Sequence, residues 1–268
     1  MQTKENIRIA ILTIATGKYP IFLDGLIDSS ENHFMLGHEK EYFVFTDSTE
    51  YKNKSTDKVN IIEQRHLGWP YDTMMRFHMF LSIKERLLEF DYVFFLNANM
   101  VFERNVGAEI LPSEENSYLV GVKHPGFHLG ISIGWDGDLK EIEFPYERND
   151  RISCHIKKGD GSHYFQGCFN GGRSTEWVEM CKCLSEMTDL DISNDLIPIW
   201  HDESYLNWYF SKRKVKALFP VYGLPEQVLE RNFSPTFINY SVLCDVKHYI
   251  IQRDKSKYGG SDFLRKNK

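Results

Sequence analysis

The chain has few cysteines, and they do not form the pattern of a zinc site or a disulfide framework. The 268 residues include five, at Cys154, Cys168, Cys181, Cys183 and Cys244. Their number is odd and no zinc-type spacing occurs; Cys181 and Cys183 stand two apart in an expected helix, where such positions point to different faces. These features argue against a disulfide-stapled scaffold and indicate reduced thiols in a cytosolic protein.

The sequence also lacks a long apolar run, a secretory signal and a strong excess of either charge. Residues 1–6 lead directly into an expected strand, and no later stretch is apolar for long enough to span a bilayer. The net charge of −6 gives no general reason to expect a nucleic-acid partner. We expect a cytoplasmic protein without a transmembrane segment; peripheral contact with the inner membrane face stays open.

A large apolar fraction is present instead, arranged as alternating strands and helices. Hydrophobic residues make up 42% of the chain and aromatic residues 14%, ample for one large domain. Strands are predicted at 7–14, 42–46, 59–62, 92–96 and 119–122, helices at 21–30, 72–89, 174–187 and about 202–212, and loops with short strands at 124–161. This alternation predicts an α/β fold with a mostly parallel sheet flanked by helices. In the helix of residues 72–89, we expect Asp72 as N-cap and an apolar stripe of Met74, Phe77, Leu81 and Leu88.

A polar turn, Asn97-Ala98-Asn99, follows the predicted strand 92–96. In an open α/β sheet, ligands bind at the carboxyl ends of the strands. The two side-chain amides can form hydrogen bonds but carry no charge, and an amide oxygen is a poor sole ligand for Mg²⁺ or Mn²⁺. The turn therefore predicts a ligand site in which a metal is not expected.

A second polar group, Trp200-His201-Asp202-Glu203, opens the predicted helix at 202–212. Carboxylates in a first helical turn are stabilised by the helix dipole, and this explanation accounts well for Asp202. It accounts less well for a tryptophan, a histidine and two acids together. A tryptophan beside carboxylates offers a sugar an apolar face and hydrogen-bond acceptors, so both interpretations stay open.

Two further segments allow either a ligand role or a structural one. His124 begins His-Pro-Gly-Phe, but a lone histidine is more often structural, and Pro-Gly is typical of turns. Between Phe165 and Gly172 there are three glycines, which permit close approach of the backbone to a ligand; alternatively, Gly171 and Gly172 only turn the chain.

Eight short motifs occur in one order along the chain. They are Thr16-Gly17-Lys18-Tyr19, Gly68-Trp69-Pro70, Met74-Met75-Arg76, Asn97-Ala98-Asn99, His124-Pro125-Gly126-Phe127, Phe144-Pro145-Tyr146-Glu147-Arg148, Gln166 to Gly172, and Trp200 to Asn207. From about Ile9 to the tail, the chain thereby resembles the family 6 glycosyltransferases, the group of the ABO blood-group A and B transferases and the α-1,3-galactosyltransferase. It is similar to the short bacterial or phage members, which lack the membrane anchor of the animal enzymes and have Asn-x-Asn in place of Asp-x-Asp.

The resemblance implies a GT-A fold in a single domain, residues 1–268. Its donor-binding part would cover about 7–123, its acceptor-binding part about 124–250 and a basic tail 251–268. The implied reaction is the retaining transfer of galactose or N-acetylgalactosamine from a UDP-sugar to the 3-hydroxyl of a β-galactoside, fucosylated or not, in an oligosaccharide or glycolipid. Glu203 matches the catalytic glutamate; whether it attacks covalently or stabilises front-face attack stays open, and both need it ionised.

Other residues match substrate-binding positions of the family. Donor positions are Thr16, Tyr19, Arg76, Asn97, Asn99, Gln166, Gly167, Cys168, His201 and Asp202, and acceptor positions are His124 and Trp200. The family's acceptor aspartate is missing, and we expect Glu226 to replace it. Cys168 is bulkier than the glycine or alanine expected there, which favours galactose over its N-acetyl relative.

No metal or other cofactor is expected. UDP leaves as an anion that positive charge must stabilise. The turn at Asn97 and Asn99 is neutral and cannot supply this charge. The candidates to supply it are therefore Lys255 and Arg265 of the basic tail, because lysine and arginine both bind phosphate well. The alternative is a basic tail that only contacts solvent.

Two other functions are alternatives to sugar transfer. One is a non-catalytic nucleotide-sugar or glycan binding protein derived from this fold; the presence of Glu203, Asp202 and Arg76 together argues against it. The other is a metal-dependent hydrolase using His201, Asp202, Glu203 and His124 or His163. Adjacent residues on a helix cannot all face one ion, which disfavours this second alternative.

Overall fold

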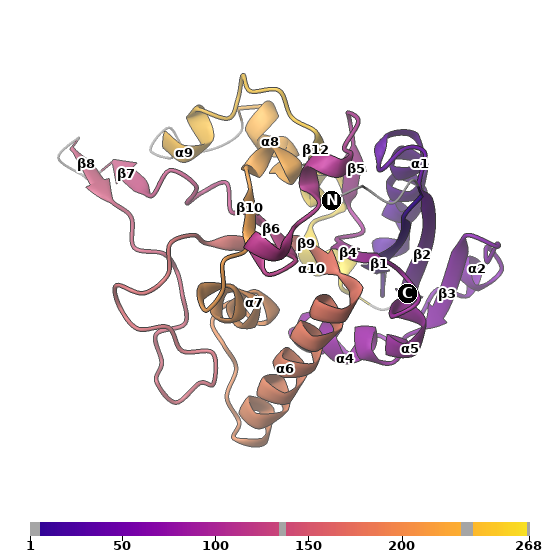
Figure 1. The fold of residues 1–268 in the computed structure, drawn as a ribbon, viewed down its shortest axis with the longest axis horizontal. Helices are drawn as coiled ribbons and strands as arrows, with labels where there is room; N and C mark the ends of the chain where they lie inside the picture. The colour runs from indigo at the N-terminus through magenta and orange to yellow at the C-terminus, as the bar shows by residue number, and fades with distance from the viewer. Residues whose placement is uncertain (1–5, 134–137, 232–237, 267–268) are drawn as a thin grey trace.

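A seven-stranded sheet forms the centre of the computed structural model, which describes residues 6–133, 138–231 and 238–266 (Figure 1). The strand order is β10-β6-β9-β4-β1-β2-β3. The strands are β1 (Arg8–Ile14), β2 (Glu39–Thr46), β3 (Val59–Glu63), β4 (Tyr92–Leu96), β6 (Leu119–Lys123), β9 (Phe165–Arg173) and β10 (Lys216–Leu218). Only β9 runs antiparallel to its neighbours. The expected GT-A type of α/β fold with a mostly parallel sheet is confirmed.

Both faces of the sheet are covered, as the apolar sequence of β1 requires. Ile9 and Ile11 belong to one core cluster and Ala10 and Leu12 to the other, and all four are fully buried. Helix α1 (Leu23–His33) contributes to the first cluster. Helices α4 (Arg76–Leu81), α6 (Ser174–Ser193) and α7 (Asp202–Ser211) contribute to the second, and Figure 1 shows these three gathered on one side of the sheet.

The single helix predicted for residues 72–89 is wrong. Three short helices occupy this stretch: α3 (Tyr71–Met74), α4 and α5 (Lys84–Leu87). Asp72 lies inside α3 rather than at its N-cap, and its carboxylate accepts from the backbone N–H of Leu67 and pairs with His66. Leu88 is 44% exposed and is not part of a buried stripe. Apolar spacing continues across the breaks, so the sequence pattern alone does not reveal them.

The glycines near the end of the segment 165–172 do not turn the chain. Gly171 and Gly172 lie within β9. A Cβ on Gly171 would stand 2.3 Å from the ring of Phe94, and one on Gly172 would stand 2.5 Å from the carbonyl oxygen of Tyr118. They are therefore glycine because β9 packs closely against its two neighbouring strands.

A smaller sheet brings the tail to the Asn97–Asn99 turn. Its order is β11 (Leu224–Pro225), β12 (Ile250–Gln252), β5 (Met100–Phe102), and β12 runs antiparallel to β5. The remaining α-helices and strands of the described residues are α2 (Thr49–Lys52), the hairpin of β7 (Ile131–Ile133) and β8 (Leu139–Glu141), α8 (Glu226–Leu229), α9 (Ile238–Ser241) and α10 (Ser261–Leu264). Because β5 begins directly after Asn99, this pairing places the tail beside the turn.

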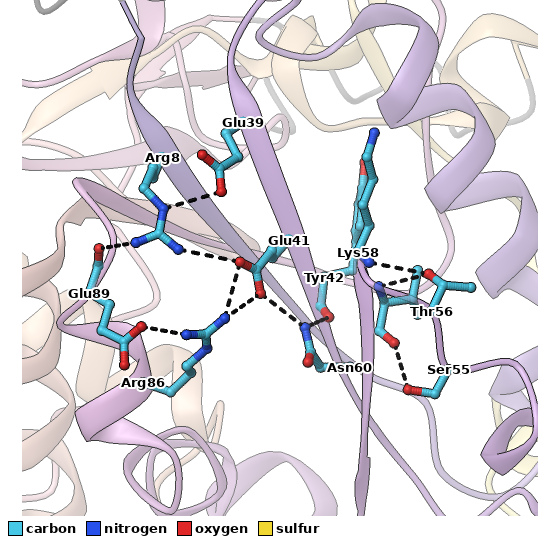
Figure 2. Close-up of polar contacts among 11 residues, drawn as sticks. Arg8, Glu39, Glu41, Tyr42, Ser55, Thr56, Lys58, Asn60, Arg86 and Glu89 are labelled. Carbon is cyan, nitrogen blue, oxygen red and sulfur yellow. Dashed lines mark hydrogen bonds and ion pairs between the residues drawn. The ribbon is translucent and has the colours of Figure 1, made fainter.

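Charged side chains cluster near the amino ends of β1 and β2, away from that turn (Figure 2). Arg8 pairs with Glu39 and Glu41, and Arg86 of α5 pairs with Glu41 and Glu89. The cluster joins α5 to the two strands. Since its charges are paired with one another and several of them are partly exposed, it is a structural feature of modest energy.

Among the described residues, no helix is both long and apolar enough to cross a membrane.

Candidate active site

Two adjoining cavities lie where the carboxyl ends of β1 and β4 meet the tail. The first is lined by Thr16, Tyr19, Asn97, Asn99, Lys255 and Arg265, among others. The second is lined by residues that include His124, Gln166, Gly167, Cys168, Trp200, His201, Asp202 and Glu203. Five residues line both cavities: Trp69, Thr73, Arg76, Asn97 and Arg265. The structure thus brings together every predicted site residue except Glu226.

Glu203 stands in the first turn of α7 with both carboxylate oxygens held by donors. The Tyr164 hydroxyl donates to Oε1 at 2.8 Å, and the backbone N–H of Gly167 donates to Oε2 at 2.6 Å. Burial raises the pKa of Glu203 to about 7, although both hydrogen bonds favour the ionised form. The result is a fixed carboxyl group that ionises near neutral pH.

Asp202 is buried and forms an ion pair instead of capping its helix. Its Oδ2 lies 2.7 Å from Nη1 of Arg76, which also donates to the carbonyl oxygen of Gly167 at 2.9 Å. The Arg76 guanidinium lies over the ring of Phe95, and its Nε has no partner in the described part of the chain. Burial raises the pKa of Asp202 and Arg76 opposes that rise. Arg76 therefore bridges α7 and β9 at the cavity wall.

Aromatic rings connect α7 to the tail. The ring of His201 packs edge-on against Trp69 at 4.5 Å between centroids, and the Arg265 guanidinium lies 3.6 Å from the Trp69 centroid. Burial and Arg265 lower the pKa of His201, which has a left-handed backbone with φ of 53°. Trp200 is 47% exposed and offers a flat apolar surface beside the carboxylates.

His124 is enclosed in the second cavity as a neutral ring. Its Nδ1 accepts from the backbone N–H of Gly126, so in the neutral ring the proton is on Nε2. Burial, helped by the neighbouring His128, lowers the pKa of His124 to about 4. The ring is therefore a hydrogen-bond donor through Nε2 at neutral pH.

The tail is held against the loop that follows β1. The backbone N–H of Lys18 donates to the carbonyl oxygen of Leu264, and the Lys18 ammonium lies over the ring of Phe263. Gly17 has φ of +62°, and a Cβ there would stand 2.9 Å from the Leu264 oxygen. Glycine is required at this position both by its backbone conformation and by the approach of the tail.

Lys255 brings a cation to the first cavity. No carboxylate lies within ion-pair distance of its ammonium among the described residues, and the Tyr19 ring lies 5.4 Å away. Burial lowers its pKa, and Arg265 adds to this effect. Within the described ranges, the one acidic partner of Arg265 is Asp262 at 3.8 Å, and Asp262 is almost fully exposed. Two adjacent cations with little local compensation are suited to an anion.

The two asparagines of the turn have different surroundings. Asn99 is buried, and its side-chain N–H donates to the backbone carbonyl oxygen of Arg253 at 2.9 Å. In return, the backbone N–H of Arg253 donates to the backbone carbonyl oxygen of Asn99 at 2.8 Å. The side chain of Asn97 lines both cavities and makes no hydrogen bond within the described residues. Asn99 thus anchors the tail, whereas Asn97 is available to a ligand.

Glu226 does not line either cavity in the described structure. Its carboxylate accepts from the backbone N–H of Asp254 at 2.7 Å and pairs with Lys257 at 3.2 Å. These contacts lower its pKa against the effect of burial. In the described structure, the side chain that we expected to contact the acceptor stabilises the start of the tail.

Sequence reasoning missed three residues of the site: Tyr164, Trp69 as a contact of His201 and Arg265, and Gln252. Trp69 belongs to the motif Gly68-Trp69-Pro70, but nothing in that motif predicts its contacts with His201 and Arg265. Tyr164 precedes the Gln166 motif and Gln252 ends an apolar strand, and neither stands in a pattern that indicates chemistry. In the described part of the chain, no cluster of three or more histidine, cysteine or acidic residues is suited to a metal ion.

An α/β fold with a held carboxylate, paired cations and an aromatic surface in one cleft is typical of a glycosyltransferase. The chain belongs to glycosyltransferase family 6, whose model matches residues 1–249. It is therefore a transferase that takes a sugar donor and a glycan acceptor.

Three relatives illustrate the range of the family. The chain is 33% identical to the O-antigen biosynthesis glycosyltransferase WbnI of Escherichia coli, over 93% of this chain and 95% of that protein. It is 32% identical to the globoside alpha-1,3-N-acetylgalactosaminyltransferase 1 of Gallus gallus, over 88% of this chain and 68% of the relative. It is 30% identical to the histo-blood group ABO system transferase 1 of Rattus norvegicus, over 84% of this chain and 63% of the relative.

Proposed function

We propose that the protein transfers galactose or N-acetylgalactosamine from a UDP-sugar to the 3-hydroxyl of a β-galactoside, forming an α-1,3 linkage with retention and without a metal ion. The observation that carries this proposal is the position of Glu203, held by Tyr164 and Gly167 beside the Arg76–Asp202 pair. The chicken relative, by its name, forms an alpha-1,3 linkage with N-acetylgalactosamine, which supports the linkage and the donor class.

In the proposed complex, the diphosphate lies on the two cations of the tail. Lys255 and Arg265 line the first cavity together with Tyr19 and Thr16, on which the uridine would rest. The sugar would then extend into the second cavity, where Asp202 and His201 can accept or donate to its hydroxyls. In this orientation, the anomeric carbon lies between the two cations and Glu203.

The reaction breaks the bond between the anomeric carbon and a β-phosphate oxygen of UDP. The bonding electrons go to UDP, where Lys255 and Arg265 stabilise the added charge. The acceptor 3-hydroxyl forms the new bond on the face that UDP leaves, and its proton passes to the departing phosphate oxygen. Glu203 either stabilises the cationic carbon from the opposite face or forms a transient ester with it, and both routes require its carboxylate.

The acceptor would lie against Trp200 and His124. Trp200 offers its exposed face to the apolar side of a galactose ring, and the Nε2–H of His124 can donate to a hydroxyl. Cys168 narrows the cavity where an acetamido group would enter, which favours galactose as the donor sugar.

The test is a matrix of two donors and three acceptors. UDP-galactose and UDP-N-acetylgalactosamine are each assayed with lactose, 2′-fucosyllactose and N-acetyllactosamine, and the product linkage is read by NMR. We expect an α-1,3 product, and Glu203→Gln should abolish it while UDP affinity stays within about twofold, because Glu203 acts on the transition state. UDP binding without transfer in any combination would favour a non-catalytic binding protein instead.

A further inference from the structure

Gln252 lines the second cavity together with the residues proposed to bind the sugar. It is the last residue of β12, at the point where the chain enters the tail. Hydrogen bonding of β12 to both β11 and β5 fixes its backbone. Its side chain therefore starts from a rigid position close to Gln166 and Cys168 in the same cavity.

The side-chain amides of Gln252 and Gln166 form a closed network with one backbone carbonyl. Nε2 of Gln252 donates to Oε1 of Gln166 and to the carbonyl oxygen of Gly223, both at 2.9 Å. Nε2 of Gln166 donates to the same carbonyl oxygen at 3.1 Å. Because a carbonyl oxygen can only accept, it fixes which end of each amide faces Gly223.

Gly223 makes room for this network. A Cβ at this position would stand 2.7 Å from Nε2 of Gln166 and 3.3 Å from Sγ of Cys168. Gln166 is 4% exposed and Cys168 is equally buried, so neither side chain has room to move aside. The two glutamines, Gly223 and Cys168 therefore form one packed wall of the cavity.

Counting hydrogens shows what this wall offers to a ligand. A primary amide has two N–H groups and one oxygen. Gln252 uses both N–H groups within the network, and Gln166 uses its oxygen and one N–H. One N–H of Gln166 and Oε1 of Gln252 have no partner among the described residues. A donor beside an acceptor is complementary to a hydroxyl or an acetamido group, because each of these groups also contains a hydrogen-bond donor and a hydrogen-bond acceptor.

We propose that Gln252 is a specificity-determining residue: it fixes the amide of Gln166 and, with it, recognises a hydroxyl or acetamido substituent of the transferred sugar. This assignment rests on the proposed function, because it requires the sugar to lie beside Glu203. The geometry supports that position, since Gly167, between Gln166 and Cys168, donates to the Glu203 carboxylate. A site that hydrogen-bonds a substituent discriminates against sugars that do not match it.

The experiment compares kcat/KM for UDP-galactose and UDP-N-acetylgalactosamine in Gln252→Met and Gln252→Glu. Methionine keeps the length of the side chain but forms neither hydrogen bond, and glutamate keeps the shape but cannot donate to Gln166. In both variants, the ratio of kcat/KM between the two donors should change by about tenfold or more, the effect of losing a buried hydrogen bond. The Kd of UDP should stay within about twofold, which also shows that the variants are folded.

Gln227→Met is the matched control. Gln227 lies in α8, its side chain contacts Asp254 of the tail, and it lines a neighbouring pocket that it shares with Gln252 but neither of the two cavities of the site. It therefore reports on disturbance of the tail without changing the amide network. An unchanged donor ratio in both Gln252 variants would overturn the assignment, as would an equal change in Gln227→Met. A wild-type protein that binds UDP but transfers neither sugar would instead refute the proposed function.

Discussion

Glu203 combines two properties that usually oppose each other, a fixed position and a pKa near neutrality. Donors that hold a carboxylate normally lower its pKa, as Tyr164 and Gly167 do here, but burial raises it to about 7. The free protein therefore holds a mixture of ionised and protonated Glu203 at neutral pH. The cations of an occupied donor site would favour the ionised form that the reaction needs.

This balance predicts the pH dependence of the reaction. Glu203 must be ionised, so kcat/KM should rise with pH through about 7 and fall about tenfold per unit on the acid side. Tyr164→Phe removes a hydrogen bond to the ionised form and should move this acid limb to higher pH. Tyr146→Phe is the control, because the Tyr146 hydroxyl donates to His163 and does not contact Glu203. An acid limb near pH 4.5, the ordinary pKa of glutamate, would contradict the account.

At the scale of elements, the tail is part of the site because several separate contacts hold it. β12 pairs with β5, Asn99 bonds to Arg253, Glu226 accepts from Asp254, and Lys18 donates to Leu264. Asn99 needs its amide for this contact, since a carboxylate in its place would face the Arg253 carbonyl oxygen. The presence of asparagine rather than aspartate at position 99 therefore has two reasons: the amide holds the tail, and it carries no charge.

Asn99→Asp should loosen the tail, whereas Asn97→Asp should not. The first variant loses its donor to Arg253 and brings two oxygens together; the second changes a side chain that makes no hydrogen bond to the tail in the described structure. Amide hydrogen exchange across residues 253–265 should increase in Asn99→Asp alone, and Mn²⁺ should not reverse the increase. Equal exchange in the two variants would show that Asn99 is not a tail anchor.

The elements that sequence predicted best are those with a single strong pattern. The strand 92–96 is apolar throughout and ends at a polar turn, and β4 has the same limits. The helix of 72–89 was wrong because apolar spacing persists where the backbone leaves the helix at Met75 and Ile83. β9 was missed because Gly171 and Gly172 resemble a turn, although what requires them is close packing, of Gly171 against Phe94 and of Gly172 against Tyr118.

At the scale of the whole molecule, the cleft joins residues from both ends of the chain. Motif order placed Glu203, Arg76 and the Asn97–Asn99 turn in one site, and the cavities contain all of them. The partners of Tyr164, Gln252 and Glu226 did not follow from sequence, because each depends on a contact with a distant segment. The hydrogen bond from Lys18 to Leu264 also joins two distant segments, and no local pattern in either segment predicts it.

In the proposed function, the cations of the tail take the place of a divalent metal. Lys255 lines the first cavity with little charge compensation, whereas Lys257 pairs with Glu226 and Glu230 and lines neither cavity. Lys255→Ala should therefore lower kcat by about a hundredfold or more, the usual effect of removing a group that stabilises developing negative charge. Lys257→Ala is the matched control and should leave kcat nearly unchanged.

The most direct measurement is the rate of sugar transfer in excess EDTA, compared with the rate in Mn²⁺, for the wild-type protein and these two lysine variants. We predict that chelation leaves the wild-type rate unchanged and that only Lys255→Ala is impaired under both conditions. Transfer that stops on chelation and returns with Mn²⁺, with Lys255→Ala as active as the wild type, would contradict the account.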